Sequence, residues 1–400
     1  MSALTLFRNF RLAHSDFTDQ QNKMAMLVQQ GKIIWIGPQG KLRGQLGKKT
    51  TVKAEHDLKN QLVFPSFIEC HTHTIFAGSR AAEFEMRNQG VSYLEIAQKG
   101  GGILSTMKAT RKSTASDLLK STQKRVDTFL KQGVSTLEIK SGYALDLKNE
   151  IKVLEVLPKL KGPRIVGTFL GAHARPPEFE TNLQYIEYVC EKVLPKIRKK
   201  NLAQRVDIFI ENKFFEKEES QIYLKKAQDL GFQITVHANQ LSLSAGADLA
   251  LDFQALSADH VIHLDDRLIR KFAASKTTAV LLPMADLYMK CPYPPARKLI
   301  EAGAQVALAT DYNPGSCPSQ DLALVGLLAR LEMKMSLPEV FQAYTHGAAC
   351  ALGIEHEEGR LEVGKYANFI CTEADLSDFF YSAGMTPDHQ MFIRGKCLKI

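Results

Sequence analysis

The chain has 400 residues, of which 45% are hydrophobic and 24% charged, as is typical of a globular protein with a large buried core. Its net charge of +8 includes short basic clusters such as 196–200. On a helix these are more typical of a solvated face than of a nucleic-acid site, so we predict no nucleic-acid partner and an attraction for a small anionic substrate. The seven cysteines are scattered and form no Cys-x-x-Cys pair. The sequence has no apolar run of membrane-spanning length and no signal-peptide pattern. We therefore predict a cytoplasmic protein without a membrane partner.

Both ends of the chain have the period-two pattern and the turn signals of short β-strands. At the N-terminal end the apolar segments are 4–12, 24–30 and 32–36, with Gly31 in position for a hairpin turn. At the C-terminal end they are 367–372, 390–394 and 397–400. Because neither set is large enough to fold alone, we predict that residues 1–62 and 358–400 pair into one small β-sandwich.

The central part, residues 63–357, alternates short apolar runs with amphipathic stretches. The runs that we interpret as strands are 63–70, 134–139, 165–172, 206–211, 233–237, 258–263, 278–283 and 305–310. Stretches typical of helices lie between them, for example 116–131, 182–199 and 218–230. Eight strands alternating with helices predict an α/β fold of the (β/α)8 TIM-barrel type. A doubly wound open sheet stays as the alternative, since alternation alone does not show closure.

The most informative motif is His71-Thr72-His73, at the end of the first run of the barrel. Alternate residues of a strand share a face, so the two imidazoles are expected to point to one spot. Enzymes with this fold build their sites at the C-terminal ends of the strands, where further polar residues occur in this chain. These are Tyr143, His173, His237, His260, His263 and Asp311.

Three imidazoles and one carboxylate at these strand ends are suited to hold a metal ion: His71, His73, His237 and Asp311. Such a set binds zinc or iron and leaves room for a water, which becomes acidic enough to attack a carbonyl or amidine carbon. On the sixth strand, His260 and His263 are three residues apart and therefore lie on opposite faces. We favour His260 for the site, because the polar cluster 257–260 ends at it.

Residues that could hold a substrate follow the strand ends. Arg80 is close behind the histidine pair and could clamp a carboxylate with two hydrogen bonds, although an ion pair with Glu83 or Glu85 is the alternative. Tyr93 and Tyr143 are either substrate contacts or buried tyrosines with a structural hydrogen bond.

Two segments rich in glycine are candidates for contact with a ligand. Gly100-Gly101-Gly102 is either a flexible hinge or a loop that lets backbone approach a ligand, and it lacks the lysine of a phosphate loop. The turn 310–316 offers polar groups to a substrate, with a plain turn as the alternative. The groups in question belong to Asn313, Gly315 and Ser316.

The His-x-His pair, the histidines on strands five and six, the aspartate on strand eight and the paired termini resemble the amidohydrolase superfamily. Longer blocks resemble one family within it, the imidazolonepropionases. These blocks are 71–87, 100–106, 138–143, 168–173, 257–260 and 309–316.

The resemblance implies hydrolysis of the ring C–N amide bond of 4-imidazolone-5-propanoate to N-formimidoyl-L-glutamate, in histidine degradation. It implies one ion, Zn2+ or Fe3+, on the four ligands named above. It also implies substrate contacts from Arg80, Tyr143 and His173, and product contacts from Tyr143, Asn313, Gly315 and Ser316.

Two positions bear on the mechanism. Gln240 stands where some members of the family carry Glu, and since an amide can only hydrogen-bond, we assign Gln240 to positioning the substrate and proton transfer to His260 and Asp311. Some relatives bridge two metals with a carboxylated lysine on strand four. Lys213 follows that strand in a different register, so we predict a single metal ion.

Two other classes of function stay open. One is a hydrolase of another cyclic amide or an aminohydrolase of a purine or pyrimidine, which Arg80 and 313–316 disfavour. The other is a metal-binding or scaffolding protein without turnover, which only Gln240 favours. A homodimer is compatible with the sequence, because such assemblies are common.

Overall fold

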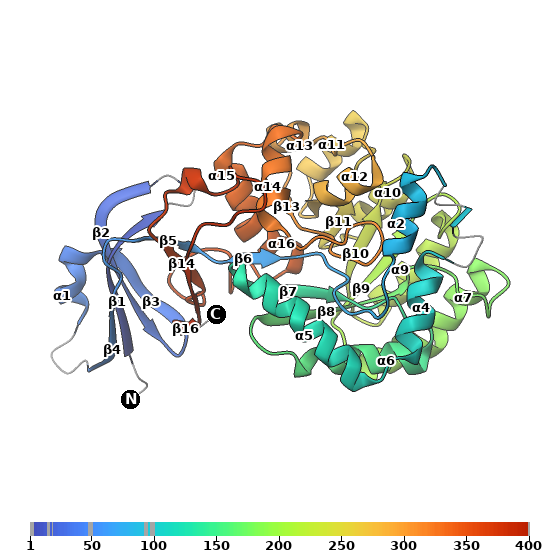
Figure 1. The fold of residues 1–400 in the computed structure, drawn as a ribbon, viewed down its shortest axis with the longest axis horizontal. Coiled ribbons are helices and arrows are strands. Elements are labelled where there is room, and N and C mark those ends of the chain that lie inside the picture. Colours follow the sequence, from blue (N-terminus) through green and yellow to red (C-terminus); the bar gives the residue numbers. More distant parts are fainter. Residues whose placement is uncertain are drawn as a thin grey trace.

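The computed structural model describes residues 4–13, 17, 19–46, 51–91, 95, 96 and 101–398. They form two units, each built around a sheet (Figure 1). A sheet made from both ends of the chain lies at the left of the figure, and a barrel surrounded by helices fills the right. Among the helices of the described residues, none has the length and apolar character needed to cross a membrane.

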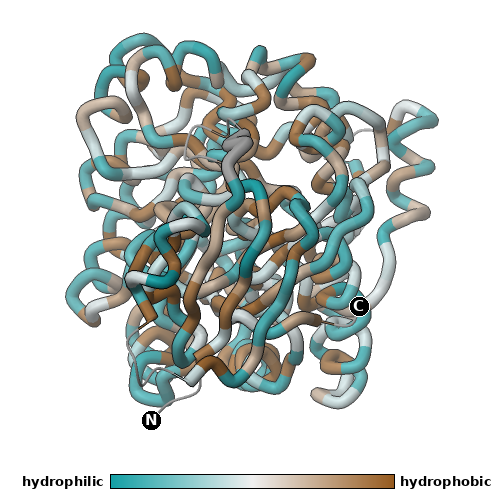
Figure 2. Tube along the Cα trace, turned by 90° about the vertical axis from the view of Figure 1, so that its left-hand side faces the viewer, coloured by the Kyte–Doolittle hydropathy of each residue, from teal (hydrophilic) through white to brown (hydrophobic). Residues whose placement is uncertain are grey.

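The smaller unit is a mixed sheet that both ends of the chain build, as predicted. Its strands are β1 (Leu4–Ala13), β2 (Asp19–Gln29), β3 (Lys32–Pro38), β4 (Val52–Asp57), β5 (Leu62–Pro65), β14 (Phe369–Thr372), β15 (Gln390–Ile393) and β16 (Lys396–Leu398). The order is β16-β15-β14-β5-β1-β2-β3, and β4 pairs with β1. Gly31, at φ +79°, lies in the turn between β2 and β3. Figure 2 shows hydrophilic and hydrophobic residues interleaved along these strands. Alternate residues of β1 and β2 belong to two separate buried clusters, one on each face of the sheet.

The larger unit is a barrel of eight parallel strands, which confirms the predicted fold class. They are β6 (Phe67–Glu69), β7 (Val134–Lys140), β8 (Arg164–Ala172), β9 (Arg205–Ile210), β10 (Gln233–Ala238), β11 (Ser257–His260), β12 (Thr278–Leu281) and β13 (Val306–Leu308). The two end strands meet just beyond their C-terminal ends, where Thr72 bridges to Tyr312. The backbone N–H of Asp311 donates to the carbonyl of His71 at 3.2 Å. The seam that closes the barrel therefore places the histidine motif beside Asp311.

Helices cover the outside of the barrel and, with the short helices of the terminal unit, complete the fold. The α-helices are α1 (Leu42–Gln45), α2 (Ala81–Asn88), α4 (Ile103–Lys112), α5 (Ala115–Lys131), α6 (Leu147–Val156), α7 (Asn182–Tyr188), α8 (Leu194–Lys199), α9 (Lys217–Asp229), α10 (Gly246–Asp252), α11 (Asp266–Ala273), α12 (Pro283–Met289), α13 (Ala296–Glu301), α14 (Leu322–Leu331), α15 (Leu337–Gln342) and α16 (Ala348–Leu352). Short 3-10 or π segments are η1 (Gln39–Lys41), η2 (Leu157–Lys159), η3 (Val189–Val193), η4 (Ala343–Gly347) and η5 (Leu376–Asp378).

Two predicted elements are interrupted, in each case at a proline. The run 63–70 is divided: β5 ends at Pro65 in the terminal sheet, and β6 begins at Phe67 in the barrel. The predicted helix 182–199 contains the π segment η3 just before Pro195, which has no N–H to donate to the preceding turn. The first interruption matters for the site, because it ties the histidine motif to both units.

Candidate active site

A buried cluster of histidines and carboxylates lies at the C-terminal ends of the barrel strands. Its members come from segments that are far apart in the chain. Three groups of potential ligands, each with its atoms within 4.8 Å of one another, are found in the described residues: His71, His73 and His237; His71, His260 and Asp311; and Asp207, His237 and Asp259.

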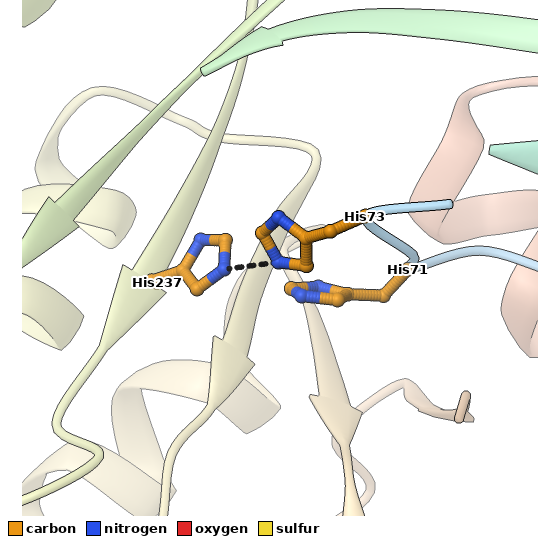
Figure 3. A group of neighbouring side chains, drawn as sticks. All are labelled: His71, His73 and His237. Atoms are coloured by element: carbon orange, nitrogen blue, oxygen red, sulfur yellow. Dashed lines mark hydrogen bonds between the residues drawn. The ribbon is translucent and has the colours of Figure 1, made fainter. Parts of the chain in front are cut away.

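The four ligands predicted from the sequence face one another. His71 Nε2 and His73 Nε2 each lie 3.4 Å from Asp311 Oδ1. His237 Nε2 lies 3.3 Å from His73 Nε2, and Figure 3 shows the three rings converging. Ligand atoms at about 2.1 Å from a tetrahedral metal ion are ~3.4 Å apart, so these separations are those of a metal site.

The hydrogen bonding of the cluster supports the same interpretation. Within the part of the chain that the structure describes, His71 Nε2 and Asp311 Oδ1 are buried without a hydrogen-bond partner, although buried polar atoms normally have one. A cation between them would satisfy both atoms. Three imidazoles with one carboxylate also form a donor set that Zn2+ and iron accept, so the residues fit the metal ion that the sequence predicts.

Backbone geometry at the ends of two strands aims side chains into the cluster. His260, at the end of β11, has φ +74°. Asp311, in the loop that follows β13, has φ +53°. Such left-handed conformations are costly for residues other than glycine and gather at functional sites.

Glu69 joins the first and last strands, because it accepts the N–H groups of His71 and Thr310, at 3.2 Å and 3.1 Å. Burial raises the pKa of Glu69 to about 8.

A second layer of buried charges lies behind the histidines. His71 Nδ1 is 2.6 Å from Asp259 Oδ2, and His237 Nδ1 is 3.0 Å from Asp207 Oδ2. Lys140 Nζ contacts both of these oxygens, at 3.4 Å from Asp259 and 2.8 Å from Asp207. Burial lowers the pKa of Lys140, but the carboxylates, Asp207 first, raise it by more, so the side chain is a buried ammonium.

Sequence reasoning did not single out Lys140, Asp207 and Asp259, which contact the predicted ligands or one another. The signal that could have found them is a charged residue in or next to a run that the sequence predicts as a barrel strand. Such a strand is buried on both sides in a barrel, so a charge on it needs a partner or a function.

Of the two histidines on the sixth strand, His260 lies at the cavity beside the cluster and is buried. Burial lowers its pKa to about 3, so the ring is neutral at neutral pH. His263 is partly exposed and does not line this cavity.

A cavity of about 200 Å3 opens in front of the cluster, a size that suits a small substrate. The polar side chains on its wall, besides the cluster, are Arg80, Tyr143, His173, Gln240, Asn313 and Ser316. The apolar ones are Ile103, Phe209, Phe214, Leu241 and Met289. Tyr93 lies outside the described residues.

Arg80 is a buried cation at the wall of the cavity. Its Nε donates to Glu83 Oε2 at 2.7 Å, the ion pair that the sequence left open. The other oxygen of Glu83 accepts the N–H of Gly102 at 3.0 Å, whereas Gly100 lies outside the described residues. The guanidinium covers Gly315 so closely that a Cβ there would lie 1.9 Å from Nη1. Gly315 thus provides the space for Arg80.

Asn313 organises the turn after Asp311. Its Oδ1 accepts the N–H groups of Gly315 and Ser316, both at 2.8 Å. Its Nδ2 donates to the carbonyl of Asp311 and to Ser316 Oγ, also at 2.8 Å. The amide of Asn313 is therefore engaged within the turn, although the residue also lines the cavity.

Tyr143 and His173 lie side by side on the cavity wall, with ring centroids 5.2 Å apart. His173 also stacks on His73, at 5.2 Å and an interplanar angle of 22°. Its Nδ1 lies 3.1 Å from the carbonyl of Gly142, which leaves Nε2 as the remaining polar atom of the ring.

Lys213, the lysine that follows strand β9, is exposed and belongs to none of the ligand groups of the described residues.

Comparisons with known proteins agree with this geometry. The profile of the amidohydrolase family matches residues 62–398. An imidazolonepropionase from Bdellovibrio bacteriovorus is 56% identical over 372 residues, which cover 93% of this chain and 88% of the relative. An imidazolonepropionase from Fusobacterium nucleatum is 40% identical over 381 residues, covering 94% and 91%.

Solved structures show how widely the fold is shared. A zinc-bound adenosine deaminase from Xanthomonas campestris has a TM-score of 0.74 at 16% identity, covering 98% of this chain and 92% of its own. Guanine deaminase from E. coli has a TM-score of 0.72 at 13% identity, covering 100% and 99%. At such low identity these structures show the fold alone, whereas the sequence relatives show the family. The chain belongs to the imidazolonepropionase family of the amidohydrolases.

Proposed function

We propose that this protein hydrolyses the ring C–N amide bond of 4-imidazolone-5-propanoate to N-formimidoyl-L-glutamate. The observation that carries the proposal is the convergence of His71, His73, His237 and Asp311 at a cavity whose wall holds the buried Arg80. The names of the sequence relatives supply the substrate. All seven cysteines are free, in keeping with the reducing cytoplasm that we propose as its location.

The four side chains would hold one ion, Zn2+ or Fe3+. When bound, the ion would polarise the ring carbonyl and make a water molecule more acidic. The ligand set does not select between zinc and iron, because imidazole and carboxylate accept both.

The protein's own residues provide the sites for the protons. Hydrolysis adds water to the ring carbonyl carbon, breaks the C–N bond and leaves a proton on the departing nitrogen. His260 has a neutral ring at the cavity, so it can hydrogen-bond the attacking water and help to relay its proton. Although burial opposes it, contact with His71 holds the pKa of Asp311 below its usual value, so this carboxylate can accept the proton that the water loses and pass the same proton to the ring nitrogen. Gln240 can only hydrogen-bond the substrate.

The propanoate carboxylate would bind to Arg80. Glu83 already fixes this guanidinium through the 2.7 Å contact with Nε, so less side-chain entropy is lost on binding. Tyr143 and His173 would hydrogen-bond the ring or the carboxylate, and Ser316 and Gly315 would contact the product.

The test is the loss of absorbance of 4-imidazolone-5-propanoate on addition of metal-loaded protein. Asp311→Asn should lower kcat by about 10²- to 10⁴-fold, since it removes both a ligand and a proton acceptor. Lys213→Ala, which changes an exposed residue beyond the same end of the barrel, should leave the rate unchanged. Full turnover by Asp311→Asn, or none by the wild-type protein loaded with either metal, would contradict the proposal.

A further inference from the structure

Lys140 is a lysine whose side chain is 0% exposed, at the centre of the barrel. Its Nζ lies 2.8 Å from Asp207 Oδ2, 3.1 Å from Glu138 Oε1 and 3.4 Å from Asp259 Oδ2. One ammonium thus links three carboxylates from strands β7, β9 and β11. A buried cation with this many charged partners is expensive to remove, because each partner would lose its compensation.

The lysine contacts the same oxygen atoms that hold two of the histidines. Asp259 Oδ2 is shared between Lys140 Nζ and His71 Nδ1, and the latter contact is 2.6 Å long. Asp207 Oδ2 is shared between Lys140 Nζ and His237 Nδ1, at 2.8 Å and 3.0 Å. Ligand atoms of Asp207 and Asp259 lie within 4.8 Å of each other, so the two carboxylates would repel without the cation between them.

We propose that Lys140 is a positioning residue that fixes the orientation of His71 and His237 through these two shared carboxylate oxygens. Each Nδ1 lies within ion-pair distance of its carboxylate oxygen, which favours the proton on Nδ1 and leaves the Nε2 lone pair facing the site. Because this inference concerns the ligands, it rests on the metal site that we propose above. Partners of metal-bound histidines set ring orientation and basicity, and their loss weakens metal binding by about 10- to 100-fold.

A purely structural role of Lys140 is the alternative, in which it only balances charge. Glu138 makes it possible to separate the two roles, because Glu138 contacts Lys140 but neither histidine. The double variant E138Q/K140M removes one negative and one positive charge, so the net charge is kept while the bridge between Asp207 and Asp259 is lost. The single variant E138Q keeps that bridge.

The experiment measures the dissociation constant of Zn2+ by competition with a chelator, using metal-free full-length protein. For E138Q/K140M we expect a Kd that is 10- to 100-fold higher than in the wild type, and for E138Q a Kd within about threefold of it. Lys152→Met is the matched control, because Lys152 caps three backbone carbonyls away from the site. The melting temperature without metal reports folding separately, and the visible spectrum of Co2+-loaded protein reports a change in ligand geometry.

The outcomes separate the two proposals. If wild-type protein binds no metal, the proposed site fails, and this inference fails with it. If wild type and E138Q/K140M bind Zn2+ equally, only the inference fails. If the double variant does not fold, 15N NMR of the wild-type protein decides: we expect Nδ1–H tautomers at His71 and His237 and a slowly exchanging ammonium at Lys140. An Nε2–H tautomer at either histidine, or rapid exchange at Lys140, overturns the inference.

Discussion

Single residues around the cavity depend on one another for space as well as for charge. Arg80 lies in a cavity wall where Glu83 holds Nε and Gly315 leaves room for the guanidinium. A pattern in the sequence could identify Arg80 as a candidate, because it follows the histidine motif closely. It could not show that Gly315, 235 positions further on, is there because of Arg80.

Gly315→Ala should therefore weaken substrate binding in the same way as a substitution of Arg80 itself. The added Cβ would lie 1.9 Å from Nη1, so the guanidinium must move from its present position. We expect KM to rise about tenfold or more with a smaller change in kcat, since the lost contact acts mainly in substrate binding. Steady-state kinetics check this.

Gly40→Ala is the control for Gly315→Ala, because a Cβ at Gly40 meets no atom within 4 Å. An unchanged KM in Gly315→Ala would mean that Arg80 does not bind the substrate in this position.

The proposed metal ligands and the residues behind them differ in how well the sequence reveals them. His71 and His73 are recognisable because their His-x-His spacing predicts that both rings point to one spot, and they do so just past the end of β6. Asp259 is recognisable only once strand order is known, since its partners His71 and Lys140 are 188 and 119 residues away. Pairing across strands is a property of the closed barrel, and no local pattern contains it.

At the scale of elements, a helix supports the loop that carries Tyr143. Glu150, near the start of α6, is buried and accepts the N–H groups of Gly142, Ala144 and Leu145, at 3.3, 2.9 and 2.8 Å. These bonds satisfy backbone donors that would otherwise be buried without partners. The helix thereby fixes the loop between β7 and α6.

Glu150→Gln should destabilise the protein, because an amide has one acceptor oxygen where the carboxylate has two. The amide NH2 group would also face backbone N–H groups, to which it cannot donate. We expect a loss of about 1–3 kcal/mol in the free energy of unfolding, and a higher KM as the Tyr143 loop loosens. Chemical denaturation measures the first and kinetics the second. Glu155→Gln, an exposed change on the same helix, should alter neither; equal stability of Glu150→Gln and wild type would rule out this support.

The helices and strands can be predicted from the sequence where the apolar periodicity is regular. The prediction fails where a proline interrupts the element. The helix from 115 to 131 was predicted within one residue of its observed bounds, because its apolar face repeats regularly and Thr114 caps it. The division of 63–70 could not be predicted from apolarity, since both halves are buried and differ only in the sheet that they join.

At the scale of the whole molecule, the terminal unit is attached to the barrel by an aromatic cluster. Phe64 of β5 lies 5.3 Å from both Phe341 and Phe379, and Phe67 of β6 continues the cluster toward Phe380 at 5.8 Å. These rings belong to the same buried core as the barrel. Since the histidine motif follows four residues after Phe67, the attachment also anchors the first strand of the site.

The architecture as a whole was accessible from the sequence, because eight alternating units leave few ways to cover a parallel sheet. The closure of the barrel cannot be predicted from the sequence, because it depends on contacts between residues 71–73 and residues 311–312. The alternation of strands and helices carries no information about these contacts. That closure brings Asp311 to the histidines.

The most direct test of the account is the metal content of purified protein, measured by elemental analysis after loading and dialysis. We expect one zinc or iron ion per chain, lost on exposure to a strong chelator together with activity and restored on adding the ion. His73→Ala and His237→Ala should each lower the bound metal well below one ion per chain. Two ions per chain, or one ion that both variants retain in full, would contradict the single site on which the account is built.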